Sequence, residues 1–311
     1  SRLFRNHLRE TGAYGFDDVT AFAGVAAGVA ANSCDWGDAD GDGWMDLYVA
    51  DAGGPNLLYR NQGDGTFVDE ALARGARLDL VSMCAMWGDY DNDQDLDLFV
   101  GNLSQAGLAG TNQLYESVGG RFAAAPGLAA ALPSRAAAWA DFDGDLDLDL
   151  YLACANSVPN QLLRNDTGNH HALAVTLLGR ASNRDGFGAT VRVVSNGRIQ
   201  YRVVSGGSGF GSQNSAPVEV GLGPATFADS LIVDWPSGRR SILAGLASGA
   251  YLVDEASALD APAVPAGGGW SLALAGAAPN PVTGRGATIA FTVPSGAARA
   301  TLALYSISGR R

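Results

Sequence analysis

Lysine is absent from this 311-residue sequence, in which all 20 basic residues are arginine. A P-loop needs a lysine at the nucleotide phosphates and Schiff-base enzymes need a lysine amine, so both chemistries are excluded. The 32 acidic residues give a net charge of −12. A chain this acidic lacks the basic surface that neutralises phosphates, so we expect no nucleic-acid partner.

Cysteine and long apolar runs are also scarce. Cys34, Cys84 and Cys154 permit at most one disulfide, so a disulfide framework is excluded and the state of the three thiols stays open. The longest small or apolar run, residues 21–31, is shorter than the roughly 20 residues of a membrane span, so we expect no spanning segment. Since no signal-like region opens the sequence and a β-rich pattern closes it, we expect a longer full-length protein.

Three segments align without gaps, and together they predict the fold class. They are WGDADGDGWMDLYV at 36–49, WGDYDNDQDLDLFV at 87–100 and WADFDGDLDLDLYL at 139–152. A period near 50 residues with four short strands per unit is typical of propeller blades. The alternation in DLDLDLYL and the 42 glycines argue against helices. We therefore expect an all-β protein that begins with a partial β-propeller of about three blades.

Aspartates recur at positions 1, 3, 5 and 9 of a nine-residue loop in every repeat. Alternate residues of a tight turn can point inward together, and calcium takes six to eight oxygen ligands. Zinc would require His or Cys, and magnesium tolerates such crowded cages poorly. We predict about three Ca²⁺ ions, each with one backbone carbonyl from loop position 7. The predicted ligands are Asp38, Asp40, Asp42, Asp46 and the Trp44 carbonyl; Asp89, Asp91, Asp93, Asp97 and the Asp95 carbonyl; and Asp141, Asp143, Asp145, Asp149 and the Asp147 carbonyl.

Acidic loops of two other kinds have a similar composition. An EF-hand requires Glu at position 12, where the three loops have Val49, Val100 and Leu152, so an EF-hand is rejected. Acidic residues also fill exposed turns without binding an ion. Three loops with the same spacing, each preceded by a tryptophan, disfavour that explanation.

The repeats resemble FG-GAP/VCBS repeats, the blades of the integrin α-subunit propeller. In that family a DxDxDxxxD loop binds Ca²⁺, and all twelve aspartates named above match the pattern. Family propellers have about seven blades, so the resemblance implies that ring closure needs blades from the full-length chain or from another chain.

A second pattern of longer alternating strands begins at Asn169. Asn196-Gly197 predicts a two-residue hairpin, and Pro236 to Gly238 predict another turn. The motifs NRDGFGATVRV, GSGFGSQNS and VDWPSGR resemble the ASPIC/UnbV domain, which follows FG-GAP repeats in bacterial proteins and in the cartilage acidic protein family. Polar residues of these motif loops are compatible with structural turns or with a binding edge: Arg184, Asp185, Gln213 and Asn214.

The remaining sequence completes the predicted domain organisation. A Pro, Ala and Gly-rich linker covers 256–269, and 270–311 resembles the start of a FlgD-like, Ig-type module used as a type IX secretion sorting signal. We therefore divide the chain into propeller blades at 1–168, an ASPIC/UnbV domain at 169–255, the linker, and an incomplete Ig-like β-sandwich.

An enzyme is not expected, and no catalytic or further cofactor-binding residue is predicted. The three histidines are His7, His170 and His171, and no HExxH, GxSxG or GxGxxG motif occurs. We expect a secreted or cell-surface calcium-binding protein that acts in adhesion or protein–protein interaction, with an extracellular protein or glycan as its partner. The alternatives are a carbohydrate-binding or glycan-hydrolysing propeller and a structural spacer with a sorting tail.

Overall fold

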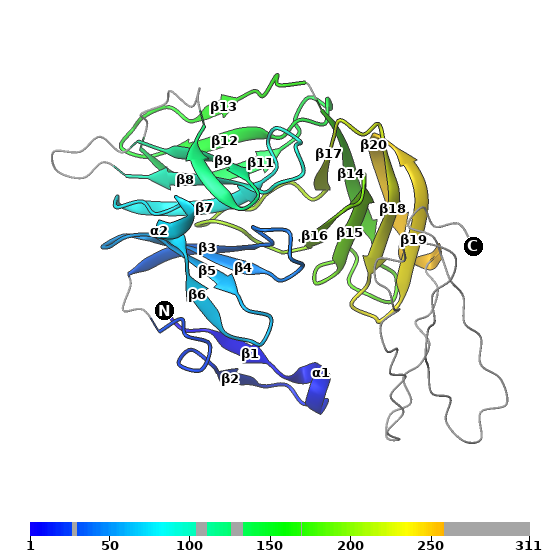
Figure 1. Cartoon of the computed structure of the whole chain (residues 1–311), viewed down its shortest axis with the longest axis horizontal. Coiled ribbons are helices and arrows are strands. Elements are labelled where there is room, and N and C mark those ends of the chain that lie inside the picture. The colour runs from blue at the N-terminus through cyan, green and yellow to red at the C-terminus, as the bar shows by residue number, and fades with distance from the viewer. Residues whose placement is uncertain (27–29, 104–110, 126–132, 169, 258–311) are drawn as a thin grey trace, which may run out of the picture. The chain divides into compact units, whose positions relative to one another are not determined.

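A computed structural model describes residues 1–26, 30–103, 111–125, 133–168 and 170–257 (Figure 1). These residues lie in the unit Ser1–Leu259, and a second unit spans Asp260–Arg311. The predicted Ig-like module at 270–311 lies outside the described residues, as does the linker at 256–269 apart from its first two residues.

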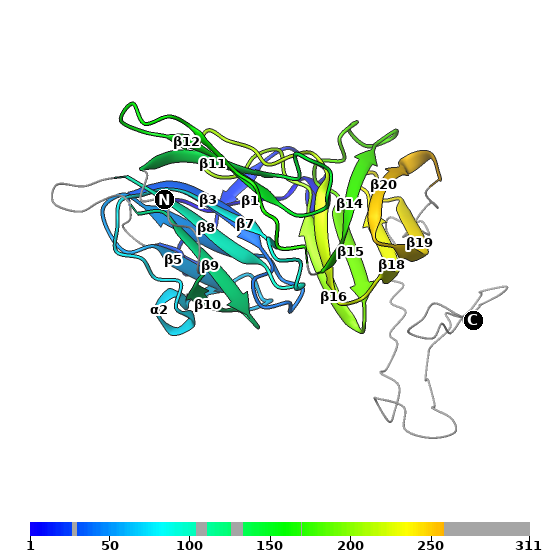
Figure 2. The ribbon, with the colours of Figure 1, turned by 90° about the horizontal axis from the view of Figure 1, so that it is seen from above.

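Three antiparallel sheets follow one another along the chain, each with its strands in sequence order. The first contains β3 Ala31–Gly37, β4 Asp46–Asp51, β5 Leu57–Asn61 and β6 Phe67–Asp69. The second contains β7 Ser82–Gly88, β8 Asp97–Asn102, β9 Gln113–Val118 and β10 Arg121–Ala124. The third contains β11 Ser134–Ala140, β12 Asp149–Cys154 and β13 Gln161–Leu163. Figures 1 and 2 show these sheets side by side, as blades.

The blades pack face to face, so the second strands of the first two blades are buried on both sides. Every residue of β4 and β8 is buried. A strand that is buried on both faces is mostly apolar along its length and does not alternate, and both sequences have this pattern. The tryptophans of the second and third repeats pack on the glycine of the preceding repeat. A Cβ on Gly37 would lie 2.7 Å from the Trp87 ring, and one on Gly88 would lie 2.9 Å from the Trp139 ring. Glycine at these positions lets neighbouring blades approach.

A two-stranded hairpin precedes the blades. It joins β1 Phe4–Asn6 to β2 Phe16–Asp18, and α1 Leu8–Thr11 lies between the two strands. Its register, with Asn6 opposite Phe16, repeats that of β5 and β6, where Asn61 lies opposite Phe67. The hairpin is therefore built like the outer half of a blade. The other short helices are α2 Ala71–Arg74 and the 3₁₀ helix η1 Glu255–Ser257.

The second region folds into two sheets around one core. One sheet has the order β17-β14-β20 and the other β16-β15-β18-β19. Alternate apolar residues of both sheets, such as Val175, Val191 and Leu231, are fully buried in a common cluster. The strands are β14 His171–Leu178, β15 Thr190–Ser195, β16 Arg198–Val203, β17 Val218–Gly223, β18 Phe227–Asp234, β19 Arg240–Ala247 and β20 Gly249–Asp254.

The predicted all-β fold with partial propeller blades is confirmed, and the blades among the described residues do not close into a ring. The predicted hairpin at Asn196-Gly197 is confirmed too. Ser195 pairs with Arg198, and both turn residues have positive φ, at 51° and 80°. The three cysteines are free thiols. The domain boundaries at 168 and 255 stay predictions.

Candidate functional site

Each aspartate-rich loop joins the first two strands of its blade, and its last aspartate opens the second strand. Asp46, Asp97 and Asp149 are the first residues of β4, β8 and β12. The side chains of these three residues are fixed identically. One carboxylate oxygen accepts a hydrogen bond from the backbone N–H at loop position 2. The other accepts one from the N–H of Asn61 in β5, of Ser117 in β9 or of Asn165, two residues beyond β13. Two N–H groups therefore orient each position-9 carboxylate toward its loop.

Hydrogen bonds accepted by the carboxylates at positions 1 and 5 are also the same in all three loops. The position-1 carboxylate accepts the N–H of position 6, at 3.0 Å for Asp38, 3.2 Å for Asp89 and 3.0 Å for Asp141. The position-5 carboxylate accepts the N–H of position 7. The loops are thus held in the same conformation by their own aspartates.

Position 6 has a left-handed backbone in every loop, which the sequence alone did not indicate. Gly43 adopts this conformation at little cost, with φ of 90°, whereas Gln94 and Leu146 adopt it with φ of 86° and 74°. Bulky residues rarely occupy this region. The carboxylate bond to the position-6 N–H stabilises the strained turn.

Carboxylate oxygens from three residues of each loop lie within 4.8 Å of one another. The first group contains positions 1, 3 and 5, and the other two contain positions 1, 3 and 9. Asp46 is therefore outside the first group, and Asp93 and Asp145 are outside the second and third. The groups are Asp38, Asp40 and Asp42; Asp89, Asp91 and Asp97; and Asp141, Asp143 and Asp149.

The second loop carries the most strongly perturbed carboxyl group. Burial raises the pKa of Asp97 to about 9, although backbone N–H groups of Ser117 and Tyr90 oppose the shift. Burial also raises the pKa of Asp89 to about 7. In the first loop, burial acts to raise the pKa of Asp40, but hydrogen bonds from Arg60 and Arg74 outweigh burial. The pKa of Asp40 is therefore lowered. The loops concentrate carboxylates that would be stabilised by a cation.

The carboxylate oxygens of these loops are ligands of the kind that a calcium ion prefers. The Oδ1 atoms of Asp38, Asp40 and Asp89 are shielded from solvent and have no hydrogen-bond partner in the described part of the chain. A buried carboxylate oxygen without a partner is costly, and a hard cation is a natural partner for it. The predicted carbonyl ligands at position 7 belong to residues whose side chains are engaged elsewhere: Asp95 binds Gly119 and Arg198, and Asp147 binds Asn92 and Gly168.

The second region lies directly against the second loop, which the sequence did not predict. The N–H of Gly221 donates to Asp89 Oδ2 at 3.1 Å, and the N–H of Gly223 donates to the Asn92 carbonyl at 2.8 Å. His170 Nδ1 lies 2.8 Å from the Asp91 carbonyl oxygen. Arg198 forms an ion pair with Asp95. Four loop residues therefore contact strands β14, β16 and β17 or the residues beside them.

Three of the four polar residues singled out in the second region have a defined place in the fold. Asn214 has a structural contact, because its Oδ1 accepts the Trp139 N–H at 3.1 Å. Gln213 lines a cavity beside it. Arg184 contributes its carbonyl to a turn with Gly179. The sequence left both interpretations open for these residues, and the structure assigns Asn214 and Arg184 contacts within the fold.

No helix in the described ranges is both long and apolar enough to cross a membrane.

Of the histidines, His7 pairs with Asp17 at 3.0 Å on the first hairpin. His170 contacts the second loop, as described above, and His171 opens β14.

Comparison with known proteins identifies both regions. The description "FG-GAP-like repeat" matches residues 38–100 and 89–152, and "ASPIC and UnbV" matches residues 179–258. Cartilage acidic protein 1 of Xenopus tropicalis is 26% identical over 305 residues, and that of Homo sapiens is 26% identical over 302 residues. These alignments cover 74% and 73% of this chain. The protein of the same name from Mus musculus is 30% identical over 157 residues, which cover 47% of this chain and 24% of the relative.

The chain spans 44% of the length of the first two relatives. Their names state no enzymatic activity. The residues that match the FG-GAP-like repeat lie within the three blades, since the first match begins at Asp38 and the second ends at Leu152. The chain is a repeat protein that carries FG-GAP-like repeats followed by an ASPIC/UnbV domain.

Proposed function

We propose that this chain is the calcium-binding part of a secreted or cell-surface protein that acts in adhesion or protein–protein interaction. The observation that carries the proposal is the set of three loops with one hydrogen-bonding scheme, each gathering three carboxylates within 4.8 Å. Bound calcium supplies positive charge and a fixed coordination shell. Extracellular modules bind Ca²⁺ with Kd on the order of 10⁻⁴ to 10⁻³ M, which is the setting we propose.

The chain's own residues prepare the loops for an ion. The position-9 carboxylates are already oriented by two N–H groups each, so little conformational entropy remains to be lost on binding. The buried Oδ1 atoms of Asp38 and Asp89 gain a partner. Calcium would therefore rigidify the inner hairpin of each blade.

Exposed aromatic side chains on the loops support a role in protein binding. Trp44 in the first loop is 52% exposed and Phe142 in the third is 51% exposed. Aromatic residues are enriched in protein interfaces. A partner that contacts the loops would then depend on calcium, because the ions hold the backbone that presents these rings.

Thermal unfolding with and without calcium tests the proposal. At about 10 mM Ca²⁺, each site with the affinity given above stabilises the fold by about 1.4 to 2.7 kcal/mol. We expect the melting temperature to rise by at least about 3 °C per site relative to a solution with EGTA. Calorimetric titration should give a stoichiometry of about three.

A matched pair of variants assigns the effect to the loops. Asp38→Asn, Asp89→Asn and Asp141→Asn together should abolish the calcium-dependent shift. Asp79→Asn, which changes an exposed aspartate paired with Arg77, should leave it intact. An unchanged melting temperature in EGTA would show that the loops bind no calcium. Calcium binding without any captured protein or glycan on the full-length protein would instead favour a structural spacer.

A further inference from the structure

Asn92 of the second loop occupies a position that glycine fills in the other two loops. Position 4 is Gly41, Asn92 or Gly144, and each has a left-handed backbone, with φ of 70°, 58° and 82°. A Cβ on Gly41 or Gly144 would meet nothing within 4 Å, whereas Asn92 is only 2% exposed. The backbone conformation is therefore shared, and only the second loop has a buried amide side chain at this position.

The side chain of Asn92 reaches the third loop. Its Nδ2 donates to Asp147 Oδ1 at 2.8 Å and to the Leu146 carbonyl oxygen at 3.2 Å. Leu146 has the left-handed backbone of position 6, and its own N–H donates to Asp141 Oδ2. A bulky residue rarely adopts this conformation, so hydrogen bonds must hold it there. Asn92 therefore supports the third loop at a residue with a strained backbone.

A second asparagine joins the same two loops from the third blade. The N–H of Asn165 donates to Asp149 Oδ1 in the third loop at 2.8 Å. Its Nδ2 donates to the Tyr90 carbonyl oxygen in the second loop at 2.6 Å and to the Leu148 carbonyl oxygen at 3.2 Å. The two asparagines thus connect positions 2 and 4 of the second loop with positions 6 to 9 of the third.

The first and second loops lack these connections in the described part of the chain. Gly41 has no side chain that could reach the second loop, and the second blade has Ser117 where the third blade has Asn165. The N–H of Ser117 donates to Asp97 Oδ1, but its hydroxyl forms no hydrogen bond with the described residues. The blades repeat, whereas the asparagine bridges occur only between the second and third loops.

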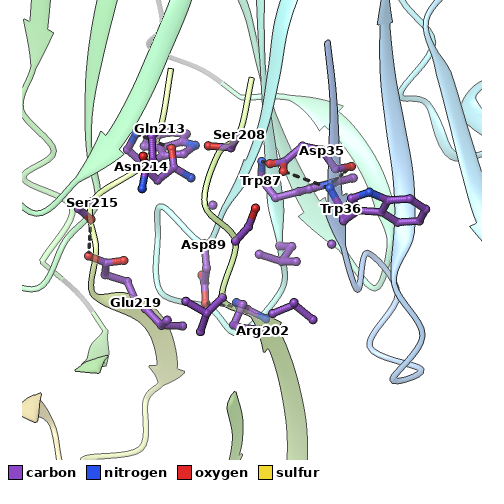
Figure 3. Close-up of a pocket in the computed structure, with 18 of the residues that line it drawn as sticks. Asp35, Trp36, Trp87, Asp89, Arg202, Ser208, Gln213, Asn214, Ser215 and Glu219 are labelled. Carbon is purple, nitrogen blue, oxygen red and sulfur yellow. Dashed lines mark hydrogen bonds and ion pairs between the residues drawn. The ribbon is translucent and has the colours of Figure 1, made fainter. Parts of the chain in front are cut away.

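The second region fixes the backbone of Asn92 as well. The N–H of Gly223 donates to the Asn92 carbonyl oxygen at 2.8 Å, and a Cβ on Gly221 would lie 2.6 Å from the Asn92 Cα atom. Figure 3 shows Arg202 of the second region beside Asp89, and a guanidinium nitrogen lies 4.0 Å from Asp89 Oδ2. Asn92 is therefore held by the third loop and by the second region together, so its amide group has a fixed direction.

We propose that the second and third loops bind calcium cooperatively through Asn92 and Asn165, whereas the first loop binds its ion independently. The inference rests on the proposed calcium-binding function and adds a coupling between its sites. Asn92 lies between the predicted ligands Asp91 and Asp93, so the amide that supports the third loop is fixed once the second loop is ordered around its ion. The third loop then loses less conformational freedom when it binds. By reciprocity, occupation of the third loop strengthens binding at the second loop to the same degree.

Calorimetry on chains with selected loops blocked measures the coupling. Every chain carries Asp38→Asn, and adding Asp89→Asn or Asp141→Asn leaves a single binding loop. The coupling factor is the overall association constant of the two-loop chain divided by the product of the two single-loop constants, and we expect it to be about 5. The titrations use about 0.15 M salt, which largely screens repulsion between exposed charges more than about 8 Å apart.

Two variants use residues that the chain already has at equivalent positions. Asn92→Gly gives the second loop the glycine of the other loops, and Asn165→Ser gives the third blade the serine of the second. Each should lower the coupling factor, and both together should reduce it to about 1. The single variants keep the test decisive if the double variant does not fold. Asn196→Gly makes the same change at an exposed left-handed turn of the second region and should leave the factor unchanged.

Hydrogen exchange measures the effect on the third loop directly. In the chain with Asp38→Asn and Asp141→Asn only the second loop binds, and calcium should slow exchange of the backbone amides at 141–149 about fivefold. The double variant with Asn92→Gly and Asn165→Ser should lose this slowing. In metal-free protein the same pair of substitutions should speed exchange in this segment, because the bridging hydrogen bonds are gone.

The possible outcomes separate this proposal from the calcium-binding function. No binding heat in either single-loop chain would contradict calcium binding itself. Binding in both single-loop chains with a coupling factor of 1 or less would overturn only the cooperative link. The link through the asparagines would also be overturned if a folded Asn92→Gly, Asn165→Ser or double variant kept the full coupling factor.

Discussion

Arg60 and Arg74 distinguish the first loop from the other two. Arg60 Nε lies 2.8 Å and an Arg74 guanidinium nitrogen lies 2.6 Å from Asp40 Oδ2. Arg60 also approaches Asp42 at 3.3 Å. The equivalent aspartates Asp91 and Asp143 show no such ion pair in the described residues. Two guanidinium groups partly neutralise the first loop at its position-3 aspartate, so they oppose a cation there, whereas Arg198 and Arg202 approach Asp95 and Asp89 of the second loop.

Arg60→Gln should therefore strengthen calcium binding at the first loop. Removal of one positive charge near the site should raise the affinity about fivefold, because repulsion of the ion is relieved and Asp40 is released. Calorimetry measures this in a chain that also carries Asp89→Asn and Asp141→Asn, so that only the first loop binds. Arg77→Gln, at an exposed arginine, is the control. Equal affinities of both chains would contradict this account.

At the scale of elements, β17 is seated on the second loop through glycine. A Cβ on Gly221 would lie 2.3 Å from Asp89 Oδ2 and 2.6 Å from backbone atoms of Asn92. These separations are far below van der Waals contact, and the Gly221 N–H also bonds Asp89. The strand can approach the loop only without a side chain at this position.

Gly221→Ala should displace β17 from the second loop. We expect the free energy of unfolding to fall by about 2 kcal/mol and the melting temperature by roughly 4 to 8 °C. Differential scanning calorimetry should also show the second region melting apart from the blades. Gly207→Ala, where a Cβ meets nothing within 4 Å, should melt as the parent chain does. A single unshifted transition for Gly221→Ala would show that the contact contributes little.

The strands themselves were accessible from the sequence, but the turn geometry was not. The repeat pattern predicted four short strands per unit, and β7 to β10 of the second blade confirm this number. The sequence does not reveal that Gln94 and Leu146 take left-handed conformations, because neither residue type favours that region. The aspartate hydrogen bonds that hold them there become visible only in the folded loop.

For the whole molecule, the metal-free fold should lose stability as pH rises. Folded Asp97 has a pKa of about 9 and folded Asp46 and Asp89 of about 7, whereas an unfolded aspartate has about 3.9. Between these values the folded chain binds more protons than the unfolded chain. The free energy of unfolding then decreases from about pH 5 to about pH 9.

Calcium should remove this pH dependence, since the ion holds the same carboxylates ionised in the folded state. Thermal melts of metal-free and calcium-saturated protein at about pH 5.5, 7 and 8.5 measure both slopes. We expect the calcium-induced rise in melting temperature to be largest at the highest pH. A metal-free protein that is equally stable at all three pH values would contradict the buried state of these carboxyl groups.

The sequence by itself determined the all-β class, the repeat period and the twelve aspartates, because the spacing of strands and loop ligands is a local property of the chain. The tertiary structure alone decided the features that join distant residues. Arg74 meets Asp40, Gly221 meets Asp89, and Asp35, Trp139 and Glu219 line one cavity. No local pattern encodes these contacts, since they depend on how separate blades and the second region pack together.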